Sequence, residues 1–369
     1  AIYGSNAFLG VINLVTGTAN AVSIGTGSHQ YHKGAIQWAA STLNSEFTVF
    51  AKQDSSRGEN QQLFNATTGL FERSRDPALN SEASVKWQWH DLTLTTRWAD
   101  RKVEKNFIEG FVADQHNFKH SNTFFVNLLY QHPLNQMLDF EGRIYTYHKK
   151  ANVQFASINT PLLGIDGDVD EDEKGFQLLL KATTEEDSRW LTGFEFRQPK
   201  LVDTTTHSFG SLEQRFLTAP ENHRNIRALF GQYQDKVLQN INYTLGLRID
   251  DYSDFGSHVS LRLGLIYQHA EHTFKLLYGE AFRAPTRAEA NLLNNPVFTG
   301  NPELEPEIAK TVELIWLHQQ QEQLWSATLF STDITEAINE TTTTPRTRIN
   351  EGQETIAGVE IDWQLEWDH

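Results

Sequence analysis

The chain has 369 residues, no cysteine and a formal net charge of −16 at pH 7. The lack of cysteine excludes disulfide scaffolds and cysteine-based metal sites. The acidic balance argues against nucleic acid as a partner, because phosphate binding needs a basic face. No run of about 18 apolar residues occurs, so the sequence holds no transmembrane helix. Membrane-spanning strands escape that criterion, because only every second residue in them is apolar.

The first segment of the chain differs from the rest. Residues 1–15 are mostly apolar and lack alternation over the length of a strand. The chain starts without Met and without a charged-then-apolar leader, so we expect it to be a fragment of a longer, processed protein.

Strands follow from about residue 21. The clearest lie at residues 241–249 and 259–267, where Ile, Leu, Val and Tyr alternate with mostly small or polar residues. A period of two belongs to a strand and not to a helix. The same alternation recurs almost to the C-terminus and predicts an all-β protein, a closed antiparallel barrel. We expect about sixteen strands, near residues 21–29, 33–41, 45–53, 82–90, 91–100, 122–131, 137–147, 175–183, 188–197, 224–234, 240–250, 257–268, 271–281, 308–318, 323–333 and 357–367.

The connections alternate between short and long. Tight turns are expected near residues 90–91, 132–136, 185–187, 236–239 and 319–322. Long loops are expected at residues 54–81, 101–121, 148–174, 198–223, 282–307 and 334–356. Long loops at one rim and tight turns at the other are typical of outer-membrane barrels, whereas a soluble sandwich spreads its loop lengths more evenly. Tyr and Trp gather towards the strand ends, where a membrane barrel meets the two interfaces. A soluble β core is the alternative interpretation of these rings.

Three segments resemble TonB-dependent outer-membrane receptors. Residues 1–16 are similar to the end of that family's plug domain. Residues 247–267 resemble a mid-barrel strand, tight loop and strand, and residues 278–290 with 300–307 resemble the paired Phe-Arg-Ala-Pro and Asn-Pro-x-Leu boxes. The plug-end motif comprises Tyr3, Gly4, Ala7, Gly10, Ile12 and Asn13. The barrel boxes comprise Phe282, Arg283, Ala284, Pro285, Asn301, Pro302 and Leu304.

The resemblance implies a transmembrane barrel of 22 strands around a plug. Residues 1–19 would then be the C-terminal end of the plug domain and residues 20–369 the barrel, with about six C-terminal strands missing. It also implies the outer membrane as location, lipid and lipopolysaccharide as surroundings, and a monomer. The TonB complex would be a partner through the missing N-terminal segment.

Two regions are candidates for ligand binding at the extracellular loops. One loop holds aromatic, His and Lys side chains suited to a bulky or chelated ligand; its candidate residues are Phe107, Phe111, His116, Phe118 and His120. The alternative for this segment is a solvated loop without a ligand. In the other region, Arg283 and Arg287 are candidates for an anionic ligand, because guanidinium groups match carboxylate or hydroxamate oxygens. The alternative for the two arginines is a set of loop salt bridges with Glu280, Glu289 or Glu303.

Other chemistry finds little support. The acidic run from Asp166 to Glu173 fails as a calcium loop, because its sixth position is Glu171 and its twelfth is Gln177. We expect a solvated loop there, with divalent cations near lipopolysaccharide as the alternative. No catalytic motif is present, so we predict no enzyme, no cofactor and no protein-bound metal. Family members that take up haem carry a His between the two boxes, and residues 286–300 contain none.

The sequence therefore predicts a receptor that binds a scarce ligand, a ferric siderophore, and imports it with TonB-coupled energy. Cobalamin, haem and saccharides remain alternative ligands. A passive porin-like barrel and a soluble all-β binding protein or carbohydrate-active enzyme remain alternative classes.

Overall fold

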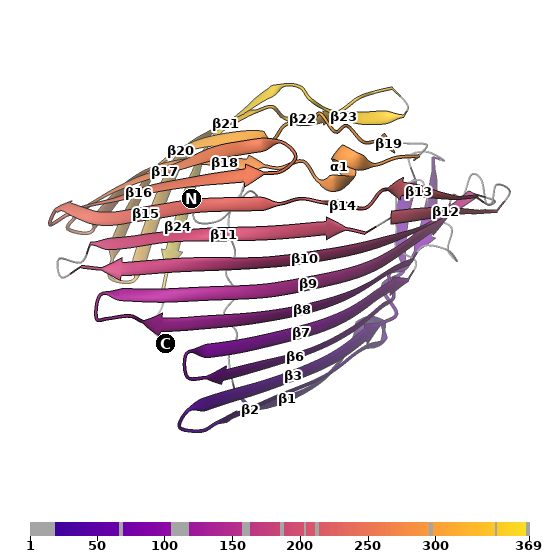
Figure 1. Ribbon diagram of the computed structural model, residues 1–369, viewed down its shortest axis with the longest axis horizontal. Helices are drawn as coiled ribbons and strands as arrows, with labels where there is room; N and C mark the ends of the chain where they lie inside the picture. The colour runs from indigo at the N-terminus through magenta and orange to yellow at the C-terminus, as the bar shows by residue number, and fades with distance from the viewer. Residues whose placement is uncertain are drawn as a thin grey trace.

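One large antiparallel sheet forms the molecule. The computed structural model describes residues 19–65, 69–104, 118–156, 163–184, 188–202, 204–210, 214–294, 298–343 and 345–366. Nineteen strands join in the main sheet, which curves like a trough (Figure 1). Its strands are β1 (Ala21–Gly27), β2 (Tyr31–Ser41), β3 (Ser45–Ser56), β6 (Ala78–Trp89), β7 (Leu92–Glu104), β8 (Phe118–Pro133), β9 (Leu138–Ala156), β10 (Leu163–Thr183), β11 (Arg189–Leu201), β12 (Thr204–Gly210), β13 (Gln214–Ala219), β14 (Asn222–His223), β15 (Ile226–Leu238), β16 (Ile241–Tyr252), β17 (Gly256–His269), β18 (His272–Arg283), β20 (Glu307–Gln320), β21 (Gln323–Thr335) and β24 (Gln353–Leu365).

The predicted strands are confirmed. Apart from the short β12, β13 and β14, every strand of the main sheet corresponds to a predicted one. Each long strand pairs with the next long strand along the chain, as in an up-and-down barrel. Within the described residues β1 pairs only with β2, and β24 only with β21. The tight turns lie together at the left of Figure 1 and the long connections at the right.

The predicted loops are shorter than expected, because the strands continue into them. β9 runs to Ala156 and β10 begins at Leu163, so most of the predicted loop at residues 148–174 is a paired hairpin. The acidic run lies within β10, where charged and polar side chains of β9 face it; the expectation of a solvated loop there was wrong. Other predicted loops contain small strands of their own: β4 (Gln61–Asn65), β5 (Leu70–Ser74), β19 (Phe298–Thr299), β22 (Ile338–Glu340) and β23 (Arg346–Asn350).

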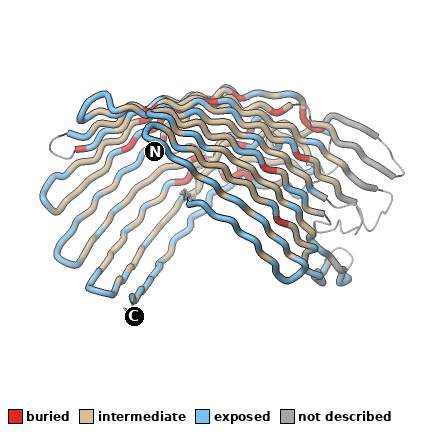
Figure 2. Tube along the Cα trace, turned by 90° about the horizontal axis from the view of Figure 1, so that it is seen from below, coloured by how far each residue is buried: buried red, intermediate tan, exposed pale blue. Residues whose placement is uncertain are grey.

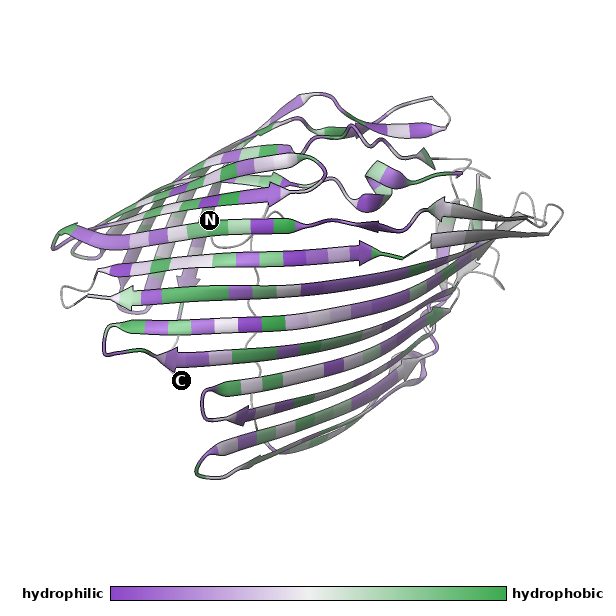
Figure 3. Ribbon diagram, viewed as in Figure 1, coloured by the Kyte–Doolittle hydropathy of each residue, from purple (hydrophilic) through white to green (hydrophobic). Residues whose placement is uncertain are grey.

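The two faces of the sheet differ in polarity: the exposed face is apolar and the buried face is polar, which is the reverse of a soluble protein. Leu245, Leu247 and Ile249 are 46, 42 and 39 % exposed, whereas Arg248 and Asp250 on the other face are 1 and 0 % exposed. Figure 3 shows the same alternation of green and purple along most strands. Apolar residues covering the outer face and polar residues lining the hollow fit a sheet surrounded by lipid. The alternative of a soluble β core is therefore not supported.

Helical structure is scarce in the described part of the chain. It comprises the five-residue α1 (Arg287–Asn291) and a short 3-10 turn, Ser28–Gln30. No described helix is long and apolar enough to cross a membrane. The fully buried residues are spread thinly over the sheet (Figure 2). A small apolar core lies near the long connections, where Ile226, Tyr252 and Phe282 pack together.

Candidate functional site

The Phe-Arg-Ala-Pro box organises the end of the sheet that carries the long connections. β18 ends at Arg283, and Pro285 lacks the N–H needed to continue the ladder. Thr286 then caps α1: its hydroxyl accepts from the backbone N–H of Glu289, and the Glu289 carboxylate accepts from the N–H of Thr286. This reciprocal pair is a capping box, and it fixes the direction in which the chain leaves the sheet.

Arg283 links that cap to the next strand. Its guanidinium lies 3.1 Å from the Glu289 carboxylate and also contacts Glu307 at the start of β20. Burial disfavours the charged form of Glu289, but the Thr286 hydrogen bonds and the Arg283 charge outweigh it, so the pKa of Glu289 is lowered. The salt bridge expected between Arg283 and Glu289 is present. Direct ligand contact by Arg283 stays a prediction.

A second arginine ties the same loop to the neighbouring strands. Arg224 donates to Asp254 at 2.7 Å and to the Pro285 carbonyl at 3.1 Å. Its guanidinium also lies over the rings of Tyr252 and Phe255. Arg287 donates to the carbonyl of Asn222.

The Asn-Pro-x-Leu box is bound in a similar way. Asn301 donates to the Arg348 carbonyl of β23, and Leu304 is buried. The backbone N–H of Asn301 also donates to the carbonyl of Glu289 at 2.9 Å, so the second box is joined to the helix that follows the first box.

The loop candidates are placed elsewhere or not described. The plug-end residues Tyr3, Gly4, Ala7, Gly10 and Asn13 lie outside the described residues. So do Phe107, Phe111 and His116. Phe118 begins β8, and His120 contacts Asp100 at 2.7 Å. His120 shares the face of Phe124 and Leu128, which belongs to the apolar outer surface. It is therefore separated from Arg283 and Arg287, and its role in ligand binding stays a prediction.

A basic pocket lies on the opposite, inner face of the same strands. It has a volume of about 450 Å³. Three cationic side chains, two hydroxyls and two aromatic rings line it: Arg97, Arg101, Lys149, Ser121, Thr123, Phe125 and Tyr147, with Ala99 at its floor. Arg97 and Lys149 have ion-pair partners in Glu82, at 2.7 Å, and Glu171, at 3.1 Å. Arg101 is exposed and makes no ion pair within the described part of the chain.

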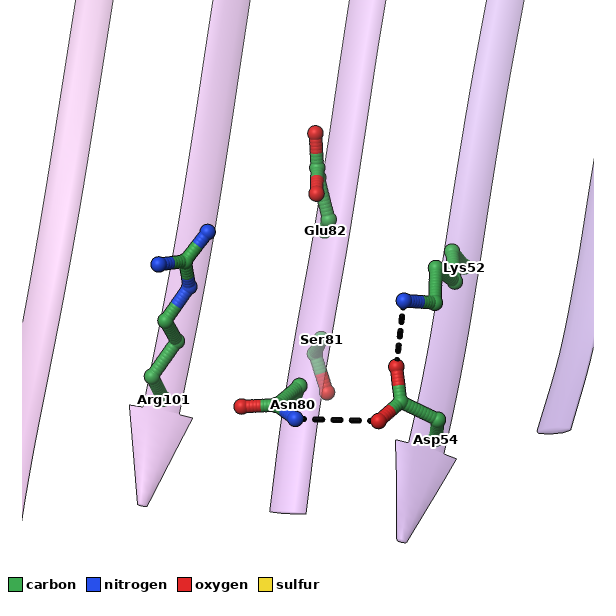
Figure 4. A pocket seen from close by; sticks show the side chains of 6 residues that line it. All are labelled: Lys52, Asp54, Asn80, Ser81, Glu82 and Arg101. Atoms are coloured by element: carbon green, nitrogen blue, oxygen red, sulfur yellow. Dashed lines mark hydrogen bonds and ion pairs between the residues drawn. The ribbon is translucent and has the colours of Figure 1, made fainter. Parts of the chain in front are cut away.

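Arg101 also borders a smaller hollow of about 200 Å³ towards β3 and β6. There Asp54 accepts from Lys52 at 2.6 Å and from Asn80 at 2.9 Å (Figure 4). Arg101 extends from β7 beside Glu82 and Asn80 of β6. The carboxylate of Asp54 is thus already paired, whereas the guanidinium of Arg101 stays open to a ligand.

Sequence reasoning missed these pocket residues. Arg97, Ala99 and Arg101 are the inward phase of β7, and Trp98 and Asp100 are the outward phase. The alternation of residues along β7 already indicated that the two arginines share a face. The register between β7, β8 and β9 was needed to place Lys149 and Tyr147 beside them. Guanidinium and ammonium groups beside hydroxyls and aromatic rings suit an anionic, oxygen-rich ligand with flat groups.

The fold and this inner pocket define part of a transmembrane β-barrel of the outer-membrane type, with a polar, partly basic interior. Within the described residues the sheet is open between β1 and β24, so the predicted closure of the barrel is not seen there. The chain belongs to the TonB-dependent receptor family: residues 16–368 match the family described as TonB dependent receptor-like, beta-barrel. Barrels of this family are outer-membrane proteins, so the predicted family, fold class and location are confirmed.

Relatives of several specificities are similar to the chain. The vitamin B12 transporter BtuB of Vibrio cholerae is 33 % identical over 116 residues, which cover 31 % of this chain and 18 % of the transporter. The ferric enterobactin receptor PfeA of Pseudomonas aeruginosa has a TM-score of 0.74 at 14 % identity, covering 97 % of this chain and 62 % of that one. The hemophore receptor HasR of Serratia marcescens has a TM-score of 0.70 at 14 % identity, covering 94 and 60 %. The chain thus spans less than two thirds of each relative, and the two structural likenesses establish the fold alone.

Proposed function

We propose that the protein is the barrel of a receptor that binds a ferric siderophore and imports it with TonB-coupled energy. The observation that carries the proposal is the basic inner pocket around Arg101, on the side of the sheet that bears the long connections. The chain is acidic overall, with a net charge of −16. Three cationic side chains around one pocket, Arg97, Arg101 and Lys149, are therefore not expected from composition alone. An anionic iron chelate offers the matching charge and oxygen acceptors.

The pocket chemistry favours an iron chelate over the alternative ligands. Arg101 is available for charge-assisted bonds and Ser121 adds a neutral hydroxyl donor. Phe125 and Tyr147 offer apolar surface to flat chelating groups. Cobalamin remains the second candidate, because a stretch of 116 residues of the chain is 33 % identical to a vitamin B12 transporter, BtuB of Vibrio cholerae.

Coupling to TonB is proposed from the family. A barrel of this kind holds a plug, so a bulky ligand does not diffuse through and import needs energy. The TonB complex is the proposed partner, and the receptor is proposed to act as a monomer. A passive porin-like barrel would instead conduct small solutes without TonB.

The proposal is tested by equilibrium binding of ferric siderophores to the intact receptor. We expect Arg101→Ala to weaken binding by about ten-fold or more, because it removes hydrogen bonds between charged groups. Arg262→Ala is the matched control, since Arg262 lies on the inward phase of β17, on a distant part of the sheet, and is also exposed. Equal affinity of the Arg101→Ala variant and the wild type would overturn the pocket assignment. If cobalamin, but no iron chelate, rescued the growth of a deletion strain, the ligand would be cobalamin and not a ferric siderophore.

A further inference from the structure

An apolar groove crosses the outer face of the sheet, on the side away from the basic pocket. It has a volume of about 570 Å³ and runs over β11, β15, β16 and β17. Its walls are large apolar side chains that the structure leaves exposed: Trp190, Leu229, Leu245, Leu247, Ile249, Leu261 and Leu263.

Small residues create the groove. Gly231 of β15 lies opposite Thr192 of β11 on one side and Leu247 of β16 on the other. The remaining outward positions of β15 carry larger side chains, so the surface is hollow only at this level. A Cβ added to Gly231 would meet nothing nearer than the Leu191 carbonyl oxygen, at 3.6 Å. The space above Gly231 is therefore open and is not filled by neighbouring side chains.

The two ends of the groove have different chemistry. Towards the tight turns it ends at two aromatic rings tilted against each other, with the centroids of Trp190 and Tyr233 4.1 Å apart. Towards the long connections the next outward residue of β15 is Arg227, whose side chain is 64 % exposed and 3.9 Å from Asp251. From Arg227 to Tyr233 the strand advances about 20 Å. With the usual tilt of about 40° this is about 15 Å of membrane depth, which is one hydrocarbon leaflet.

We propose that this groove is a binding site for lipopolysaccharide, with one acyl chain along Gly231 and a phosphate at Arg227. The long connections of such barrels face outwards, so Arg227 lies at the headgroup level of the outer leaflet. A guanidinium at that level complements a phosphate, and the apolar groove below it complements an acyl chain. The inference rests on the outer-membrane location of the family and is independent of the ligand proposed for the interior.

The test measures lipid bound to the intact receptor, purified from outer membranes in mild detergent. Native mass spectrometry quantifies retained lipopolysaccharide, and titration with lipopolysaccharide or phosphatidylglycerol gives the relative affinities. We expect Gly231→Leu, which fills the groove, and Arg227→Gln, which removes the cation, each to weaken lipopolysaccharide binding about ten-fold.

Matched controls come from other parts of the outer face. Gly142→Leu places a leucine on β9, where an added Cβ meets Phe140 at 3.4 Å and Leu178 at 3.7 Å. Lys310→Gln removes an exposed cation of β20 that pairs with Glu280. Both controls should leave lipopolysaccharide binding unchanged. Heat-modifiable migration on gels verifies that every variant is folded.

Three outcomes would overturn the proposal. They are unchanged binding in both groove variants, equal affinity of the wild type for phosphatidylglycerol, and a change in oligomeric state with Gly231→Leu, which would assign the groove to a second copy of the chain. Binding of the iron chelate should stay at the wild-type level in both groove variants, so failure here is distinguishable from failure of the proposed function.

Discussion

At the scale of single residues, Arg283 shows how one side chain unites several segments. It ends β18, pairs with Glu289 in the first turn of α1 and contacts the first residue of β20. From the sequence, Arg283 was recognised as part of the Phe-Arg-Ala-Pro box, and a salt bridge to Glu289 was one alternative to ligand binding. Glu307 was not among the expected partners, because its approach depends on the pairing of Arg283 with Glu307 across β18 and β20. Residue identity thus predicts chemical capacity, and register decides which partner meets it.

The capping carboxylate makes the order of α1 depend on pH. The pKa of Glu289 is lowered in the folded loop from its ordinary value of 4.5. A lowered pKa means that the stabilisation is fully present above the unfolded pKa and is lost as the pH falls through the folded value. Protection factors for hydrogen exchange of residues 286–292 in the intact receptor, which are corrected for the intrinsic pH dependence of exchange, should therefore be unchanged between pH 7 and about pH 5. They should fall as the pH drops below the ordinary Glu value of 4.5 and through the lowered pKa of Glu289.

Glu289→Gln should give fast exchange in α1 already at pH 7, because the charge facing Arg283 is gone. Glu303→Gln is the control, since Glu303 is an exposed carboxylate in the same loop region. Slow exchange of the Glu289→Gln variant at pH 7 would show that the ion pair does not order this helix.

At the scale of elements, three glycines allow aromatic rings to lie across a neighbouring strand. Gly175, Gly193 and Gly358 are each directly opposite an aromatic residue: Tyr145, Phe230 and Phe330. An added Cβ would approach those rings to within 2.6 Å in each case. Such glycine–aromatic pairs hold the register of twisted strands. The sequence contained the glycines, but their partners became visible only once the pairing of strands distant in sequence was known.

Substitution of Gly193 tests this arrangement. Gly193→Val should lower the free energy of unfolding by about 1–3 kcal/mol, because the new side chain displaces Phe230 and Leu179 from a filled space. Gly279→Val is the matched control on β18, where an added Cβ has no neighbour within 4 Å. Urea unfolding of the intact receptor in lipid vesicles measures both. Equal destabilisation by the two substitutions would mean that β propensity or backbone entropy dominates, and not the ring contact.

Element length was the least predictable feature. Strand alternation is not visible where both faces of a strand are polar. The sequence therefore predicts a strand that stops at residue 147 and a partner that starts at residue 175, whereas β9 runs to Ala156 and β10 begins at Leu163. In the structure they continue as a paired hairpin, with His148 and Asp172 2.6 Å apart and Lys149 and Glu171 3.1 Å apart. Cross-strand ion pairs support strands above the apolar surface. A pattern based on hydrophobicity does not detect them.

At the scale of the whole molecule, the alternation of apolar and polar residues along the strands gives the sheet an apolar outer face and a polar inner face. The outward residues of β16 and β17 form the wall of the apolar groove, and the inward residues Arg248 and Asp250 form a buried ion pair at 2.8 Å. This global arrangement was predictable from the sequence because it repeats on most strands. The basic pocket was not, because it combines single side chains from β7, β8 and β9 whose neighbourhood depends on register.

The orientation of the two faces gives the prediction on which the molecular interpretation depends. Leu247 lies near the middle of the outward apolar row of β16, and Thr244 lies on the inward phase of the same strand. Leu247→Arg should destabilise the intact receptor in lipid vesicles by about 2–4 kcal/mol, because a guanidinium would enter hydrocarbon. Thr244→Arg introduces the same side chain into a polar interior and should cost much less, by the same urea-unfolding measurement. If Thr244→Arg were the more costly substitution, hydrocarbon would lie on the polar side of the strand, and neither the inner basic pocket nor the outer lipid groove would have its assigned surroundings.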